Sequence, residues 1–393
     1  MAYNPSATKN DRKLTQMKQI PYAAQWIDDD DIGAVVSALR SSHLTQGPLV
    51  AQFEEAIATY CGAKYAVAMN SGTSALHAAC HAAGVVSGDE VITSPITFVA
   101  SSNCILYCGG KPVFADVQDD TVNIDPNEIE KKITKDTKVI IPVHFAGHPC
   151  DMEKISSIAK EKGIKVIEDA AHALGSVYKG SKIGSCKYSD MTILSFHAVK
   201  HITTGEGGMV LTNDQELYKK ILLFRTHGIT RDAEMMTKND GPWYYEMHDL
   251  GFNYRITDFQ CALGMSQLKK LDSFIRRRRE IVQKYQKAFS GIPELVLPIE
   301  RGSISSAWHI YVIRVKGDRK AVFNSLREKG LGANVHYYPV YLQPYYQKLG
   351  YKVETCPKAE EYYSHAITLP LYPKMTNEDV EYVIDAVKAS LKG

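Results

Sequence analysis

The stretch that decides the fold is SFHAVKHITTGEGGMV, residues 195–210. The apolar run MTIL precedes it, and the apolar run MVL ends it after a glycine-rich turn, so we expect two strands joined by a loop. Lys200 lies in that loop, five residues after Ser195. Between two buried strands, desolvation would lower the pKa of this lysine and make it a nucleophile for Schiff-base chemistry. The alternative is an exposed loop lysine, as most lysines are.

Working outward, the stretch VIEDAAH (residues 166–172) is an apolar run that ends in two acids. Asp169 is expected at the carboxyl end of a strand, where its carboxylate could hold a ligand's ring nitrogen in the protonated form. The alternative is that Asp169 caps the next segment, a common task for Asp. His172 is either a partner of the same ligand or a buried histidine with an internal hydrogen bond.

Further upstream, NSGTSAL (residues 70–76) follows a β-rich run and opens an alanine-rich helix. Gly72 permits a tight turn there. The free N–H groups of a first helical turn form a site for a phosphate or carboxylate. The hydroxyls of Thr73 and Ser74 add two donors. The alternative is a plain helix N-cap, since Ser and Thr are common at that position.

Short β-rich runs alternate with helical patterns through the middle of the chain, which is typical of a mostly parallel sheet covered by helices on both faces. We expect strands at residues 65–69, 90–93, 112–116, 139–143, 165–168, 191–195 and 208–211, and helices at 73–83, 98–107, 151–162, 214–224 and 268–289. The sequence predicts an α/β protein with a polar lead (1–24), a large domain (25–270) and a small C-terminal α/β domain (271–393). In such sheets, ligands bind beyond the carboxyl ends of the strands.

Composition excludes several classes of protein. The 393 residues carry 46 Lys plus Arg against 44 Asp plus Glu, a net charge of +2, so neither nucleic acid nor an anionic membrane is predicted as a partner. The N-terminus lacks a hydrophobic signal core and no run of 18 apolar residues occurs, so we expect a cytoplasmic protein. The eight cysteines include no CxxC pair and are interpreted as buried thiols in a reducing compartment.

Pyridoxal phosphate (PLP) requires three kinds of group: a binding site for its phosphate, an acid for its ring nitrogen and a lysine. The sequence offers all three in this order, at Gly72, Asp169 and Lys200. With these three motifs, the sequence resembles the DegT/DnrJ/EryC1/StrS family of sugar-nucleotide aminotransferases from about residue 20 to the C-terminus. The resemblance implies PLP as cofactor and the aspartate-aminotransferase fold, fold type I: a large domain with a mixed, mostly parallel sheet, plus a small C-terminal α/β domain.

The resemblance also implies roles for individual residues. Lys200 would form the Schiff base with PLP and shuttle the proton during transfer, while Asp169 would pair with the pyridine nitrogen. His172 would lie near the phenolic oxygen. The other cofactor contacts implied are Gly72, Thr73, Ser74 and Ser195 on the phosphate, Phe98 stacked on the ring, and Asn253 reaching the phosphate of the neighbouring subunit. Asn253 therefore implies a homodimer with two shared sites.

For the substrate, the resemblance points to a loop at Thr45 and Gln46 and to two C-terminal elements, His309 with Tyr311 and His336 with Tyr337. Aromatic and histidine side chains suit a sugar face and a uracil ring. The alternative for the tyrosines is that they pack in the core of the small domain, because aromatic side chains bury a large area.

Within the family, the lysine stretch and GPWYYEMHDLGFNYRITDFQCALG (residues 241–264) resemble the branch that acts in pseudaminic acid biosynthesis. That likeness implies transfer of an amino group from L-glutamate to C4 of UDP-2-acetamido-2,6-dideoxy-β-L-arabino-hexos-4-ulose. One alternative is another nucleotide-linked keto sugar: a dTDP-linked 3- or 4-keto sugar, or a UDP-linked precursor of bacillosamine or aminoarabinose. An alternative of another class is a PLP-binding regulator without catalytic activity. Such a regulator would need an added DNA-binding or effector domain, for which we expect no room in the chain.

Three further patterns are interpreted as structural. His77 and His81 have i, i+4 spacing, but the glutamate of HExxH is absent, so no metal site is predicted. The run from Arg276 to Arg279 is interpreted as a solvated helix surface, with a diphosphate or nucleic-acid patch as the alternative. Cys104 and Cys108 share a helical face and are interpreted as core residues.

Overall fold

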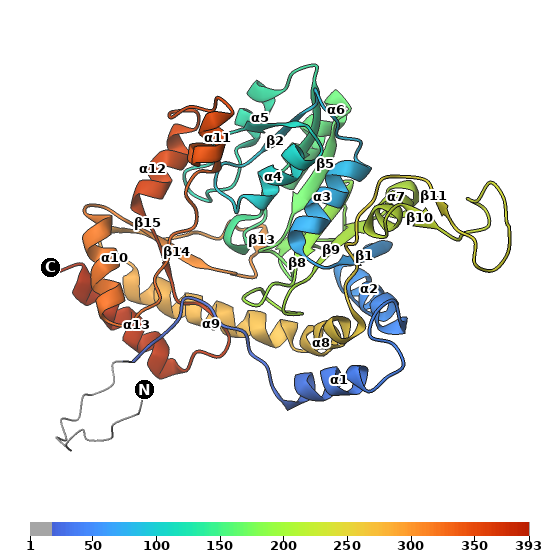
Figure 1. The fold of residues 1–393 in the computed structure, drawn as a ribbon. Coiled ribbons are helices and arrows are strands. Elements are labelled where there is room, and N and C mark those ends of the chain that lie inside the picture. Colours follow the sequence, from blue (N-terminus) through green and yellow to red (C-terminus); the bar gives the residue numbers. More distant parts are fainter. Residues whose placement is uncertain (1–17, 393) are drawn as a thin grey trace, which may run out of the picture.

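The computed structural model describes residues 18–392 of the chain. Residues 1–17 of the predicted polar lead (1–24) therefore lie outside the described residues. The described chain folds around one large sheet, with a second group of helices and short strands at the C-terminal end (Figure 1).

The large sheet has seven strands in the order β1-β9-β8-β5-β4-β2-β3. Strand β9 runs antiparallel to both of its neighbours, and the remaining strands run parallel to one another. The sheet is thus mixed and mostly parallel, as predicted. Its strands are β1 (Tyr65–Met69), β2 (Glu90–Thr93), β3 (Lys111–Phe114), β4 (Thr137–Ile141), β5 (Lys165–Asp169), β8 (Met191–Ser195) and β9 (Gly208–Thr212).

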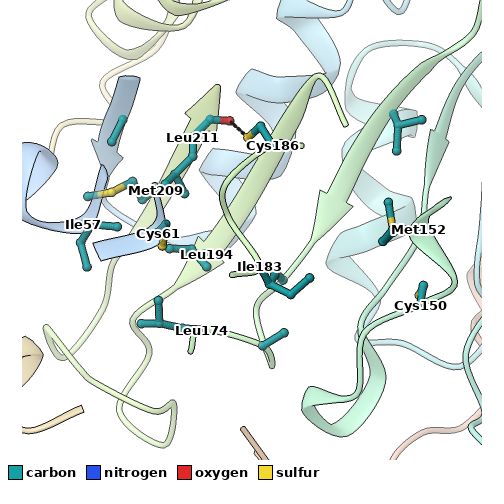
Figure 2. Close-up of a cluster of buried hydrophobic side chains, with 14 of the residues drawn as sticks. Ile57, Cys61, Cys150, Met152, Leu174, Ile183, Cys186, Leu194, Met209 and Leu211 are labelled. Atoms are coloured by element: carbon teal, nitrogen blue, oxygen red, sulfur yellow. Dashed lines mark hydrogen bonds between the residues drawn. The ribbon is translucent and has the colours of Figure 1, made fainter. Parts of the chain in front are cut away.

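Side chains of this sheet alternate between two apolar cores because successive residues of a strand point to opposite faces. In β9, Met209 and Leu211 belong to one core and Val210 to the other. Figure 2 shows Leu194, Met209 and Leu211 in the first core near Ile57 and Cys61, with Cys186 donating its thiol hydrogen to the Leu211 carbonyl at 3.3 Å. Both faces of the sheet are therefore buried, which explains the continuous apolar runs of its strands.

Helices cover both faces (Figure 1). The core on one face includes residues of α3 (Gly72–Ala82), α4 (Ala100–Tyr107) and α7 (Gln215–Arg225). The core on the other face includes residues of α2 (Pro48–Cys61), α6 (Met152–Lys162) and α8 (Asp258–Leu268). Helix α1 (Asp29–Leu39) packs on α8, and α5 (Pro126–Lys132) packs on α6. Short elements complete this part: η1 (Phe145–Gly147), β6 (Val177–Tyr178), β7 (Ser181–Lys182), β10 (Ile229–Thr230) and β11 (Glu246–Met247).

The C-terminal part begins with α9 (Leu271–Phe289), which is separated from α8 by two lysines. It packs with α10 (Arg319–Glu328) and α13 (Asn377–Ser390) around a core that contains Tyr285 and Tyr311. We propose that the two domains meet at residue 270, between α8 and α9. The other elements are β12 (Leu295–Val296), β13 (Ile304–Ser305), β14 (Tyr311–Val315), η2 (Val340–Leu342), α11 (Pro344–Lys348), α12 (Pro357–His365) and β15 (Ala366–Leu369).

The arginine run on α9 does not form the solvated surface that the sequence suggests. Arg276 is exposed, whereas Arg277 binds the Met375 carbonyl and Arg279 binds Glu300. Arg278 is 1% exposed and points into the core of the C-terminal part. Four consecutive residues span a full helical turn, so they face the core, its margin and solvent in succession.

Within residues 18–392, no helix is both long enough and apolar enough to span a lipid bilayer.

Candidate active site

A cavity of about 720 Å³ lies where the carboxyl ends of β1, β5 and β8 meet the C-terminal part of the chain. Most of the predicted site residues line it: Gly72, Thr73, Phe98, Asp169, His172, Ser195, Lys200, His309, His336 and Tyr337. These residues come from positions up to 265 apart in the chain, between Gly72 and Tyr337. The residues that follow β1, β5 and β8 meet because the carboxyl ends of these strands share one edge of the sheet, and the C-terminal part adds His309, His336 and Tyr337.

One wall of the cavity is the N-terminus of α3. Ser71 and Ser74 form a capping box, in which each side chain binds the other residue's backbone N–H. The N–H groups of Gly72 and Thr73, in the first turn, have no intrahelical acceptor. A Cβ on Gly72 would lie 3.0 Å from the Ser195 Cβ, so only glycine leaves this cradle open. Together with the Ser195 hydroxyl, this turn can bind an anion.

Asp169 forms a second wall at the end of β5 and is 4% exposed. Its Oδ2 accepts a hydrogen bond from the Ser101 hydroxyl at 2.6 Å, and its Oδ1 accepts one from the Ala171 N–H at 3.1 Å. The neighbouring Glu168 points to the opposite face and binds His144 at 2.7 Å. Strand alternation thus assigns one acid of the pair to the cavity and the other to the core. Asp169 therefore accepts a nearby backbone N–H, as the cap alternative expects, and also lines the cavity.

Lys200 lies in the loop after β8, half-buried at the floor of the cavity. Burial lowers its pKa to about 8, and the negative charge of Asp169 opposes that shift. An appreciable fraction of Lys200 is therefore a neutral amine at neutral pH, as a nucleophile or general base requires.

Histidines line the side of the cavity nearest the C-terminal part. The rings of His172 and His309, which both line the cavity, lie 4.3 Å apart between centroids. The ring of His201, which is not part of the lining, lies 5.4 Å from that of His309. Burial lowers the pKa of all three, and the positive charge of Lys200 adds to the effect. The Nδ1 atoms of His172 and His309 are buried without a protein partner, while His172 Nε2 lies 3.2 Å from the Tyr337 hydroxyl. Burial lowers the pKa of His336, which also lines the cavity, to about 4.

Some predicted site residues do not line this cavity. Ser74 uses both its hydroxyl and its N–H in the capping box, which is the plain N-cap alternative. Tyr311 is fully buried against Tyr285 in the C-terminal core, so the prediction of a substrate contact from Tyr311 is wrong for this cavity. Packing of β14 against α9, rather than the local sequence, decides the orientation of Tyr311.

Thr45, Gln46 and Asn253 are exposed and lie outside the lining of the cavity. Thr45 pairs with Thr257, which places the predicted substrate loop beside the start of α8. The Asn253 carbonyl accepts a hydrogen bond from Asn70, one residue before the α3 cap. The role predicted for Asn253 requires a second subunit, which is taken up below.

The sequence did not single out four polar residues of the cavity. Ser101 donates a hydrogen bond to Asp169, and Tyr22, Asn334 and Gln343 also line the cavity. Ser101 follows Phe98 by three residues, which is the helical spacing that puts two side chains on one face. The other three lie in segments without a chemical motif, so only the fold brings them to the site.

The patterns set aside from the sequence have internal partners. His81 binds Asp249 at 2.6 Å, and His77 lies 3.0 Å from the Tyr254 hydroxyl. These contacts hold the segment around Asn253 against α3. Cys104 is buried with its sulfur 3.6 Å from that of Cys80, whereas Cys108 is only partly buried.

The chain matches the profile of the DegT/DnrJ/EryC1/StrS aminotransferase family over residues 25–388. Among curated relatives, the spore coat polysaccharide biosynthesis protein SpsC of Bacillus subtilis is 44% identical over 95% of this chain and 97% of its own length. A Campylobacter jejuni protein named UDP-4-amino-4,6-dideoxy-N-acetyl-beta-L-altrosamine transaminase is 39% identical over 95% of this chain and 98% of its own.

Solved structures agree with this match. PseC of Helicobacter pylori, an aminotransferase involved in the biosynthesis of pseudaminic acid, superimposes with a TM-score of 0.89 at 35% identity, covering 95% of this chain and 100% of its own. Spr1654 of Streptococcus pneumoniae, solved in a PLP form, has a TM-score of 0.90 at 33% identity, covering 95% and 99%. This chain belongs to the DegT/DnrJ/EryC1/StrS family of PLP-dependent sugar aminotransferases and has the type I fold of that class.

Proposed function

We propose that this enzyme transfers the amino group of L-glutamate to the C4 keto carbon of UDP-2-acetamido-2,6-dideoxy-β-L-arabino-hexos-4-ulose, a step towards pseudaminic acid. The observation that carries the chemistry is the convergence of Lys200, Asp169 and the α3 N-terminus on one cavity. The acceptor is supported by likeness to the Campylobacter transaminase and to Helicobacter PseC.

The residues around the cavity fit PLP. The open cradle at Gly72, with the first turn of α3 and the Ser195 hydroxyl, suits a phosphate. Asp169 suits a protonated pyridine nitrogen, and Phe98 suits the ring face because its side chain is 60% exposed beside the cavity. PLP, when bound, supplies an electron sink that allows an amino group to leave one carbon and join another.

In this proposal each side chain has a defined task. Asp169, oriented by Ser101, keeps a proton on the ring nitrogen. Lys200 holds the cofactor before substrate enters and afterwards moves a proton between the donor carbon and the cofactor carbon, as general base and then acid. His172, neutral because of its burial, offers a hydrogen bond to the phenolic oxygen.

For the acceptor, we propose contacts from His309, His336 and Tyr337. His309 and His336 line the cavity as neutral imidazoles, since burial lowers the pKa of both. A neutral imidazole can both donate and accept a hydrogen bond, which suits the hydroxyl and acetamido groups of the sugar.

We further propose that two copies of the chain form a homodimer that shares its active sites. Large apolar side chains are exposed near Asn253: Tyr107, Trp243, Met247, Leu250 and Phe252. The segment that carries β10 and β11 extends away from the body of the chain (Figure 1). Exposed apolar groups of this kind favour a protein interface. In such a dimer Asn253, Thr45 and Gln46 would reach the partner's cavity.

The second candidate is the same chemistry on a different nucleotide-linked keto sugar. It is favoured by the higher identity, 44%, to SpsC, whose name concerns spore coat polysaccharide. We place either reaction in the cytoplasm, because all eight cysteines are free thiols, as in reducing compartments.

Absorbance spectra of the purified protein with PLP test the proposal. L-glutamate alone is expected to convert the lysine-bound cofactor band to that of the amino form, and the UDP-linked 4-keto sugar is expected to restore it. A change with glutamate that the UDP sugar does not reverse would reject this acceptor and favour the second candidate. Absence of any lysine-bound band in the folded protein would reject the site assignment.

A further inference from the structure

Arg278 is a buried cation beside the active site. It is 1% exposed, and its Nη1 donates to three backbone carbonyls: Trp308 at 3.3 Å, His309 at 3.0 Å and Leu371 at 2.9 Å. Its Nε is buried without a partner, and no Asp or Glu between residues 18 and 392 forms an ion pair with it. Burying an unpaired charge is costly, so an apolar residue would serve packing alone better.

The carbonyls that Arg278 binds belong to the turn that presents His309. Trp308 has a φ of 49°, a left-handed conformation that is strained for a bulky side chain. The turn is held on one side by the His309 N–H, which donates to the Ala146 carbonyl at 2.8 Å, and on the other side by Arg278. Removing either support would free the turn to relax.

We propose that Arg278 is a positioning residue of this active site, whose guanidinium holds the turn at Trp308 so that the His309 imidazole faces the cavity. It does not touch the cavity itself, which is lined by His309 but not by Arg278. This inference rests on the proposed role of His309 in binding the acceptor.

The charges around His309 support the assignment. The titratable groups whose charge acts on its ring are His172 from the segment after β5, Lys200 and His201 from the loop after β8, and Arg278 from α9. Burial lowers the pKa of His309 most, and His172, Lys200, His201 and, with the smallest effect, Arg278 lower it further. Arg278 therefore helps to keep His309 neutral and able to accept a hydrogen bond.

The test compares Arg278→Met with Arg276→Met, a control on the same helix with an exposed side chain. With the UDP-linked 4-keto sugar, Arg278→Met is expected to lose roughly tenfold or more in kcat/KM, because a small displacement of a positioned group has effects of that order. Its thermal unfolding temperature is expected to fall, because three buried carbonyls lose their donor, so both variants are assayed well below the onset of unfolding. The acid limb of its pH profile is expected to move to higher pH, since losing a positive charge raises the pKa of His309.

A double-mutant cycle with His309→Gln separates positioning from packing. If Arg278 acts through His309, replacing Arg278 in the His309→Gln background causes little further loss. A wild-type pH profile and kcat/KM in folded Arg278→Met, or an undiminished loss in the His309→Gln background, would overturn the proposal. If Arg278→Met does not fold, Arg278→Lys takes its place in the same cycle. Its loss in kcat/KM is expected to be smaller and to disappear in the His309→Gln background.

A second readout needs no acceptor. In ¹⁵N-histidine NMR spectra of the PLP-loaded protein, the signal that His309→Gln removes should titrate at higher pH in Arg278→Met than in the wild type or Arg276→Met. An unchanged titration contradicts the inference about Arg278. A wild-type enzyme that does not aminate the UDP sugar contradicts only the proposed acceptor, so the two failures are distinguishable.

Discussion

At the level of single residues, the pKa of Lys200 makes a direct prediction. Burial brings it to about 8, and Asp169 opposes that shift, so Asp169→Asn should move the titration of Lys200 to a lower pH. The measurement is pH-dependent labelling with acetic anhydride before PLP is added, read peptide by peptide in a mass spectrometer. Lys200 should react with a midpoint near 8 and Lys162, which is exposed, at a much higher pH. A Lys200 midpoint that rises in Asp169→Asn would contradict the geometry.

At the level of elements, the junction of β9 and α3 makes the second prediction. A Cβ on Gly208 would lie 2.2 Å from the Ser71 carbonyl oxygen and 2.7 Å from the Gly72 nitrogen. Gly208→Ala should therefore push the capped turn away from the sheet, destabilise the protein by about 1–3 kcal/mol and weaken PLP binding. Thermal unfolding and PLP titration measure both effects. Gly302→Ala, where a Cβ meets open space, is the control and should change neither. Equal unfolding temperatures and equal PLP affinities of the two variants would refute a role for close packing of Gly208 against the turn at Gly72.

At the scale of the whole molecule, the proposed shared sites make the third prediction. Lys200→Ala and Asn253→Asp each damage both sites of their own homodimer. If Asn253 acts across the interface, a heterodimer of the two variants has one site with both defects and one intact site. Mixing equal amounts after subunit exchange should therefore restore about a quarter of wild-type activity. Activity no greater than the sum of the two variants, with exchange verified by mass spectrometry, would place Asn253 outside the partner's site.

Much of this protein follows from local sequence. The strands at residues 65–69, 90–93 and 191–195 have the predicted bounds, and the other strands of the large sheet differ from prediction by one or two residues at one or both ends. Buried strands are apolar along their whole length, so their pattern is visible without the fold. The motifs at Gly72, Asp169 and Lys200 follow such strands, and a parallel sheet gathers its carboxyl ends at one edge.

What the local pattern does not contain is the direction and surroundings of each side chain. The sequence predicted a substrate contact for Tyr311 and a solvated surface for the run that contains Arg278. The packing of α9 against the C-terminal strands buries both side chains. Ser101, Asn334 and Gln343 enter the site only because distant segments close around it. A local motif determines backbone conformation and chemical type, since both depend on near neighbours. Burial, and with it the pKa of Lys200 and the surroundings of His309, depends on contacts between residues that lie in different elements, far apart in the chain, so it arises only when the chain is packed.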